Sequence, residues 1–318
     1  MSVGARSGVA RLPQILFALV LAIAAIGIGG TPASYRAVAQ TPIDCSTFPA
    51  LAAAASPTAA TPAIPATDMT PAAAVPFPEG GGDLTVFAAA SLTNAFDEIG
   101  ATLESGNEGL DITFYYAGSQ ALVTQLTEGA EGDVFASANT TQMTIAANAG
   151  LIDGDPRALV GNRLALVVPT DNPAGITGLA DLSGDDVSLV LAQLDVPVGQ
   201  YVWQSLCLAG ADTATYGDGF VEAVTGNIVS EEEDVRDVLT RVQLGEADAG
   251  IVYVSDYVAT EGGGVALIEI PDAVNVVASY PIAPVAGGDA ELAAAFISYV
   301  LGSDGQAVLE DYGFQPPA

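Results

Sequence analysis

The chain has 318 residues, 38 acidic side chains, seven basic side chains that are all arginine, and no histidine, which gives a formal net charge of −31. The lack of histidine and lysine excludes Ser-His-Asp, Cys-His and Ser-Lys catalytic arrangements and removes the most common zinc ligand. The acidity argues against nucleic acid and anionic membranes as partners, but it is compatible with a small anion because exposed charges beyond ~8 Å are largely screened.

Residues 1–39 have the layout of a secretory signal peptide. Arg6 and Arg11 precede an apolar run at 15–28, and Ala37-Val38-Ala39 is a small-residue cleavage site. Cleavage leaves a mature chain from Gln40, in which 4 arginines face 38 acidic side chains for a net charge of −34. The alternative is an uncleaved anchor, although the apolar run is shorter than the ~20 residues that span a bilayer. In both cases the protein is expected to be extracytoplasmic, whether secreted, periplasmic or on the cell surface, and an anchor would tether it to the membrane.

Residues 40–82 are rich in alanine, proline and threonine and are predicted to be a linker. Such a composition suits a tether or stalk, and it equally suits a disordered tail. The linker contains Cys45, and the only other cysteine is Cys207. An exported chain with two cysteines is a candidate for one disulfide. The alternative is a free Cys45 and a Cys207 that packs as a small apolar residue.

Two similar turns open the region 83–318. The first turn, Ala88-Ala89-Ala90-Ser91, and the second, Tyr116-Ala117-Gly118-Ser119, each follow a short apolar strand and precede a helical pattern. A serine at such a position is a natural N-cap. It also places a hydroxyl beside unpaired backbone N–H groups. Two such helix starts brought together would form an anion site without lysine or arginine.

The rest of the chain reads as alternating strands and helices, which predicts an α/β protein with parallel sheets covered by helices. Its length allows one large domain or two lobes. The predicted strands are 133–136, 163–168, 187–191, 250–254, 265–270 and 274–279, and the predicted helices are 142–149, 200–208, 234–244, 291–301 and 305–312.

Several runs in this region resemble, in order, those of the molybdate-binding proteins that serve ABC importers. The resembling runs are 85–96, 132–138, 161–164, 195–199, 233–236, 250–256 and the end at 312–314. The resemblance covers 83–318 and implies a two-lobed fold of the type II periplasmic binding protein kind, with a ligand cleft between the lobes. It places lobe one at 83–161 and 280–318, and lobe two at 162–279.

The resemblance also implies a set of ligand contacts. These are the hydroxyls and backbone N–H groups of Ser91 and Ser119, the backbone N–H groups of Val198 and Val235, and the phenol of Tyr253. Without the resemblance, Tyr253 would read as a core residue. Two positions depart from the family pattern: Val198 replaces the usual alanine, and Gly118 stands where some relatives have serine.

All of these contacts are hydrogen-bond donors. Molybdate and sulfate are fully deprotonated near neutral pH and offer only acceptors, whereas phosphate keeps a proton and needs an acceptor. The acidic residues 231–234 are expected to stabilise the start of the following helix instead of touching the anion. Arg236 is expected to point away from the ligand, with Asp234 and Asp237 as its partners.

The predicted function is that of an extracytoplasmic solute-binding protein that captures molybdate, and also tungstate, for an ABC permease. No catalysis, no cofactor and no metal other than the molybdenum of the oxyanion are expected, and the protein is expected to act as a monomer. The first alternative is the same fold tuned to another tetrahedral oxyanion such as sulfate. More remote alternatives are a secreted enzyme with Ser91 or Ser119 as its nucleophile and a surface adhesin.

Overall fold

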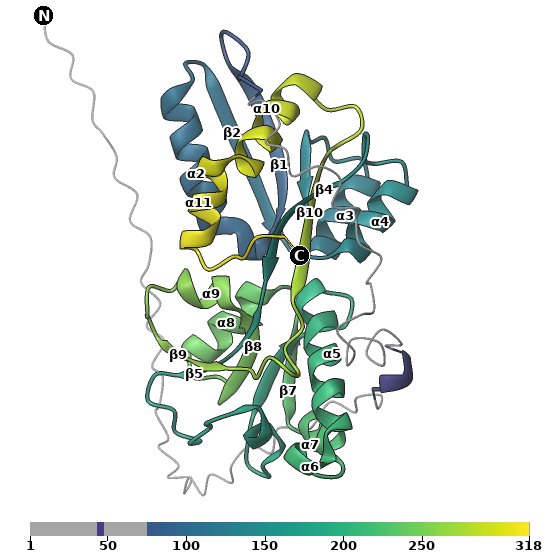
Figure 1. Ribbon diagram of the computed structural model, residues 1–318, viewed down its shortest axis with the longest axis vertical. Helices are drawn as coiled ribbons and strands as arrows, with labels where there is room; N and C mark the ends of the chain where they lie inside the picture. The colour runs from purple at the N-terminus through teal and green to yellow at the C-terminus, as the bar shows by residue number, and fades with distance from the viewer. Residues whose placement is uncertain (1–42, 48–74, 318) are drawn as a thin grey trace, which may run out of the picture. The chain divides into compact units, whose positions relative to one another are not determined.

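The computed structural model describes residues 43–47 and 75–317, which form two mixed sheets with helices packed against them (Figure 1). The predicted signal peptide and most of the predicted linker lie outside these residues. The first sheet has the strand order β2-β1-β3-β10-β4. Its strands are β1 (Gly82–Ala89), β2 (Leu110–Ala117), β3 (Val134–Ala136), β4 (Arg157–Asn162) and β10 (Ala278–Pro284).

The first sheet and its helices make up the first lobe. The helices are η2 (Ala90–Leu92), α2 (Thr93–Gly106), α3 (Ser119–Thr127), α4 (Thr140–Asn148), α10 (Ala290–Leu301) and α11 (Ser303–Asp311). Phe96 of α2 packs on Phe114 of β2 and on Phe296 of α10, with ring centroids 6.0 and 5.6 Å apart. Such aromatic pairs stabilise beyond the area they bury. They attach both helices to the same side of β2.

The second sheet has the order β7-β6-β8-β5-β9 and makes up the second lobe. Its strands are β5 (Leu164–Pro169), β6 (Leu189–Ala192), β7 (Ile228–Glu232), β8 (Ala249–Tyr253) and β9 (Val265–Glu269). Its helices are η3 (Leu179–Ser183), α5 (Pro197–Ala211), α6 (Thr213–Tyr216), α7 (Phe220–Gly226), α8 (Val235–Gln243) and α9 (Val254–Val258). Every residue of β5 is buried, which explains its uninterrupted apolar run.

The two sheets are built alike, and both depart from the expectation of parallel sheets. In the first, β1 pairs in parallel with β2 and β3, while β10 runs antiparallel to β3 and β4. In the second, β6 pairs in parallel with β7 and β8, while β5 runs antiparallel to β8 and β9. The antiparallel strands belong to the two places where the chain changes sheet, between β4 and β5 and between β9 and β10. At those places the chain passes directly to the other sheet, without the crossover helix that a parallel connection needs.

Three strand segments differ from the sequence prediction, and the short helices η3, α6, α7 and α9 were not predicted. The strands β4 and β7 were not predicted; β7 lies at a sheet edge and ends in two glutamates, which weakens its strand pattern. The strand predicted at 274–279 is largely a loop, and β10 begins at Ala278 and continues through Pro281. A register shift at Tyr280/Pro281 accommodates the proline, which has no N–H to donate.

The two cysteines form a disulfide. Cys45, in the short helix η1 (Cys45–Thr47), is bonded to Cys207 in α5, with Cα atoms 5.6 Å apart. Ile43 packs against the core beside it. This part of the predicted linker is therefore attached to the second lobe, and of the two alternatives for the cysteines the disulfide is confirmed.

Within the described part of the chain, no single helix is long and apolar enough to cross a membrane, and only the bent pair α10–α11 passes that test when its two helices are combined.

Candidate functional site

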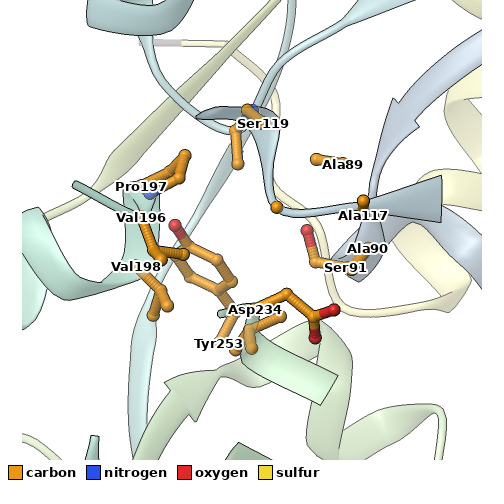
Figure 2. A pocket seen from close by; sticks show the side chains of 13 residues that line it. Ala89, Ala90, Ser91, Ala117, Ser119, Val196, Pro197, Val198, Asp234 and Tyr253 are labelled. Atoms are coloured by element: carbon orange, nitrogen blue, oxygen red, sulfur yellow. The ribbon is translucent and has the colours of Figure 1, made fainter. Parts of the chain in front are cut away.

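A small cavity lies between the two lobes, where the carboxyl ends of the parallel strands of both sheets meet (Figure 2). Three segments of the first lobe line it, following β1, β2 and β3, and three of the second lobe, at the ends of β6, β7 and β8. This is where open α/β sheets bind ligands. All five residues predicted as contacts line this one cavity: Ser91, Ser119, Val198, Val235 and Tyr253.

The two serines are buried in the cavity wall, but neither caps its helix. Ser91 lies within η2 and Ser119 is the first residue of α3, and no side-chain cap bond is made at either helix start. The N-cap interpretation is therefore wrong. Ser91 Oγ is 2.8 Å from Tyr280 Oη, and Ser119 Oγ accepts a hydrogen bond from the Ala138 N–H at 3.0 Å. The hydroxyls are thus available for a role other than capping.

The second lobe presents the starts of two helices. Val198 is the second residue of α5, and Val235 is the first residue of α8. The first N–H groups of a helix have no intrahelical acceptor, and the helix dipole adds positive potential there. The approach of α5 depends on Gly199, because a Cβ at this position would lie 2.0 Å from the carbonyl oxygen of Gln193. The two N–H groups are suitable donors for an anion.

Tyr253 ends β8 and is 1% exposed. Its hydroxyl has no hydrogen-bond partner among the described residues, and Figure 2 shows it directed into the cavity. Burial raises the pKa of the phenol well above its ordinary value, so the group keeps its proton. A buried donor without a partner is costly. A ligand acceptor in the cavity would remove that cost.

The acidic residues beside the cavity do not all behave as predicted. Asp234 borders the cavity, and its side chain caps α8 by accepting hydrogen bonds from the N–H groups of Arg236 and Asp237. The expected helix-stabilising role is confirmed for Asp234. It is wrong for Glu232, which is the last residue of β7 and contacts Ser230 and Arg241, the latter in the last turn of α8.

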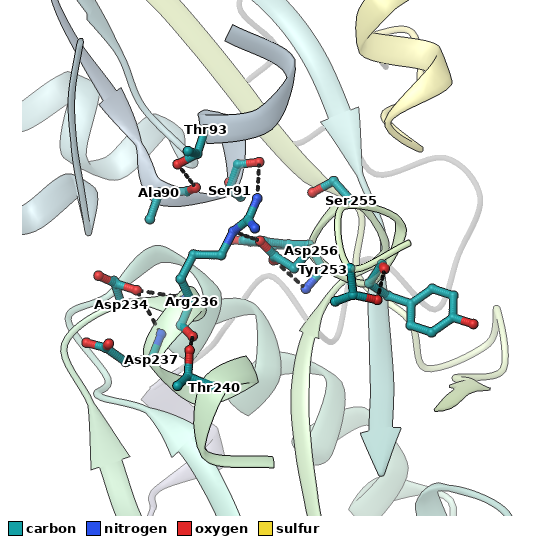
Figure 3. Close-up of polar contacts among 12 residues, drawn as sticks. Ala90, Ser91, Thr93, Asp234, Arg236, Asp237, Thr240, Tyr253, Ser255 and Asp256 are labelled. Carbon is teal, nitrogen blue, oxygen red and sulfur yellow. Dashed lines mark hydrogen bonds and ion pairs between the residues drawn. The ribbon is translucent and has the colours of Figure 1, made fainter. Parts of the chain in front are cut away.

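Arg236 does not line the cavity, as expected, but its predicted partners are wrong (Figure 3). Its Nε lies 2.8 Å from Oδ1 of Asp256, and its Nη2 donates a long hydrogen bond of 3.5 Å to the Ser91 carbonyl in the other lobe. Asp256 is fully buried and also accepts the Tyr253 N–H. The arginine thus offsets a buried carboxylate behind the cavity.

Uncharged side chains of the first lobe reach across to the second around the cavity. Gln120 Nε2 donates to the Glu233 carbonyl at 2.8 Å, Asn139 Nδ2 to Gln200 Oε1 at 3.0 Å, and Gln142 Nε2 to the Asp195 carbonyl at 3.2 Å. Sequence analysis missed these residues. Their positions in the sequence could have identified them, because each lies within a few residues of a predicted contact or of a cavity-lining turn.

The cavity volume is about 10 Å³, whereas one water molecule needs roughly 10–15 Å³ when the volume is measured in the same way. The cavity as it stands therefore has room for about one water molecule and leaves no space for an extended organic molecule. No group of three or more cysteine, aspartate or glutamate side chains within 43–47 and 75–317 could hold a metal ion. The donors that converge here are neutral, and what they can bind is an acceptor.

Comparison with known proteins shows the family of this chain. Residues 84–315 match the family described as bacterial extracellular solute-binding protein. The molybdate-binding protein ModA of Mycobacterium tuberculosis is 40% identical over 245 residues, 75% of this chain and 87% of the relative. The ModA of Escherichia coli is 34% identical over 244 residues, 73% of this chain and 89% of the relative.

Solved structures show the same fold. The substrate-binding domain of a putative molybdenum ABC transporter from Clostridium difficile has a TM-score of 0.56 at 27% identity, covering 74% of this chain and 99% of that one. The sulfate-binding protein SubI of Mycobacterium tuberculosis has a TM-score of 0.66 at 19% identity, covering 74% and 86%. The predicted resemblance and the two-lobed α/β fold are confirmed, and the chain belongs to the bacterial extracellular solute-binding protein family.

Proposed function

We propose that this protein captures molybdate outside the cytoplasm and delivers it to the membrane subunits of an ABC importer. The observation that carries the proposal is the convergence of neutral donors from both lobes on one small cavity, including the Tyr253 hydroxyl that has no partner among the described residues. The identity of 40% to a molybdate-binding relative supports the choice of anion. As a member of a solute-binding family, the chain is not an enzyme.

The chemistry of the cavity favours a fully deprotonated tetrahedral anion. In this proposal the hydroxyls of Ser91, Ser119 and Tyr253 and the N–H groups of Val198 and Val235 donate to its oxygens. The starts of α3, α5 and α8 supply the positive potential that a dianion needs without a cation in contact with it. Tungstate offers the same acceptors as molybdate, so we propose that it binds as well.

The domain assignment follows from the same proposal. Lobe one comprises 83–161 and 280–318 and lobe two 162–279, and closure of the two lobes around the anion produces the form that the permease recognises. Residues 1–39 serve as the export signal or as an anchor, and residues 40–82 as the segment that connects it to the binding domain. The protein acts as a monomer, because each chain contains every group that the site needs.

Calorimetric titration of the purified, exported chain with molybdate, tungstate, sulfate and phosphate tests the proposal. Loss of a hydrogen bond to a charged ligand costs ~1.5–3 kcal/mol, so Ser91→Ala and Ser119→Ala should each lose roughly 10- to 100-fold in affinity. Ser183→Ala is the matched control, because its exposed hydroxyl bonds only the Ala180 carbonyl. Tighter binding of sulfate than of molybdate would favour the alternative oxyanion. Unchanged affinity in both cavity variants would refute the site.

A further inference from the structure

A buried chain of hydrogen bonds runs behind Ser91 to the place where the polypeptide passes between the lobes. Tyr280 Oη lies 2.8 Å from Ser91 Oγ and 3.3 Å from Asn162 Nδ2. The same Nδ2 is 2.8 Å from Oγ of Ser255 in the second lobe. All four side chains are at most 3% exposed. Neither Tyr280 nor Asn162 lines the cavity. Ser91 connects them to it by hydrogen bonds, and the Tyr280 ring also packs on Tyr253 with ring centroids 5.8 Å apart, so a test variant must keep that ring.

The donor and acceptor of each of these hydrogen bonds can be assigned, starting from a group that can only donate. Asn162 Oδ1 faces the Arg163 N–H at 3.0 Å, and an N–H can only donate. The other end of the amide, Nδ2, therefore faces Tyr280 and Ser255 and donates to both. Tyr280 Oη thus accepts from Asn162. Ser91 Oγ, 2.8 Å away, is then placed to accept the proton of Tyr280 itself.

Tyr280 has a proton to donate throughout the physiological range, because burial raises the pKa of its phenol far above the ordinary value. Ser91 Oγ accepts that proton, and it has no other hydrogen-bond partner in the described part of the chain. A hydroxyl that accepts on one side still has its own proton to place. An anion in the cavity can accept the proton of the Ser91 hydroxyl. Ser119 is held in the same way, since its Oγ accepts the Ala138 N–H.

We propose that Tyr280 and Asn162 are positioning residues that turn the Ser91 hydroxyl into an obligate donor toward the cavity, and so select anions that carry no proton. The inference rests on the proposed function of this site. A protonated anion could donate to Ser91 only if the serine proton found another acceptor, and the described residues offer none. In this proposal the hydrogen bonds from Asn162 to Tyr280 and from Tyr280 to Ser91 disfavour phosphate, although Asn162 and Tyr280 lie outside the cavity.

The test is a double-mutant cycle between Ser91→Ala and Tyr280→Phe, with affinities for molybdate and phosphate measured by calorimetry. Tyr280→Phe keeps the ring and removes the donor to Ser91. We expect a loss of roughly 3- to 10-fold in molybdate affinity, the range for one neutral hydrogen bond, and a smaller ratio of molybdate to phosphate affinity. In the Ser91→Ala background the same substitution should have no effect on affinity. Tyr312→Phe, whose hydroxyl donates to Glu98 at the surface, is the control.

A second variant, Asn162→Asp, exchanges the donor for an acceptor of the same shape. The phenol proton then turns to the new carboxylate, Ser91 donates to Tyr280, and the cavity loses one donor. We expect a larger affinity loss than for Tyr280→Phe, and part of it should disappear in the Ser91→Ala background. Repulsion of the dianion by the new charge would remain in both backgrounds, so the cycle separates the two effects.

Each outcome has one meaning. Higher molybdate affinity in Tyr280→Phe means that Ser91 donates to Tyr280 in the wild type, and equal affinity means that this bond does not affect the ligand; either result overturns the inference alone. An equal loss with and without Ser91 means a general structural role and also overturns it. A wild-type chain that binds none of the four anions refutes the proposed function, and the inference falls with it. Melting temperatures of all variants identify any that fail to fold.

Discussion

Removal of the Cys45–Cys207 disulfide should lower stability without changing ligand affinity. The bond closes a loop with a sequence separation of 162 residues. Chain entropy lost by the unfolded state for a loop of this length corresponds to about 5 kcal/mol at 25 °C. The gain is smaller if residues 43–47 leave α5 in the reduced native protein, because that state then also gains freedom. A loss of about 2–5 kcal/mol is therefore expected for the double variant Cys45→Ala/Cys207→Ala.

Differential scanning calorimetry measures this loss as a lower melting temperature. At roughly 2–4 °C for each kcal/mol in a domain of this size, the shift should be at least ~4 °C. Reduced wild-type protein should melt like the double variant. Molybdate affinity should stay within about twofold, since Cys207 lies nine residues, or ~13 Å, along α5 from Val198. Equal melting temperatures for oxidised wild type and double variant, or two alkylatable thiols in denatured, unreduced wild type, would refute the reasoning.

Three further results are expected. Gly118→Ala should weaken molybdate binding, because its Cβ would lie 2.5 Å from the side-chain amide of Gln120 and 2.6 Å from the Glu233 carbonyl oxygen of the other lobe. Gly106→Ala, with open space around it, should not weaken binding, and equal affinities for the two variants would contradict this prediction. Molybdate association measured by stopped flow should become faster as salt rises, because a chain of net charge −31 repels a dianion at long range; slower association would reveal a local basic field. Burial raises the pKa of Asp256 to about 6 from 3.8, against the opposing effect of Arg236. The folded state then holds this proton more tightly than the unfolded state, so the stability that the protonated Asp256 contributes is present below about pH 4 and is lost as the pH rises to about 6, up to about 3 kcal/mol. The free energy of unfolding of Asp256→Asn, measured in urea, should lack this decline. Parallel pH profiles for the variant and the wild type would argue against this prediction.

Much of the site could be predicted because the fold places its ligand groups at the ends of strands. The strands before Ser91 and Ser119 have clear apolar patterns, and all five predicted contacts line one cavity. The N-cap roles were wrong because local pattern alone does not say whether a helix starts at a serine or one or two residues earlier. The partner of Arg236 was wrong for a related reason: a long side chain on a helix can reach another element, here the start of α9.

The amino-acid sequence by itself determined the class of fold, the location of the two anion-facing turns and the exclusion of histidine- and lysine-based catalysis, since these depend on local periodicity and on which residue types are present. Only the tertiary structure decided the mixed sheets, the disulfide and the hydrogen bond between Tyr280 and Ser91. Cys45 and Cys207 are 162 residues apart and Ser91 and Tyr280 are 189 residues apart. Contacts over such separations depend on how the lobes pack, and a hydroxyl acquires a direction only from the buried groups that surround it.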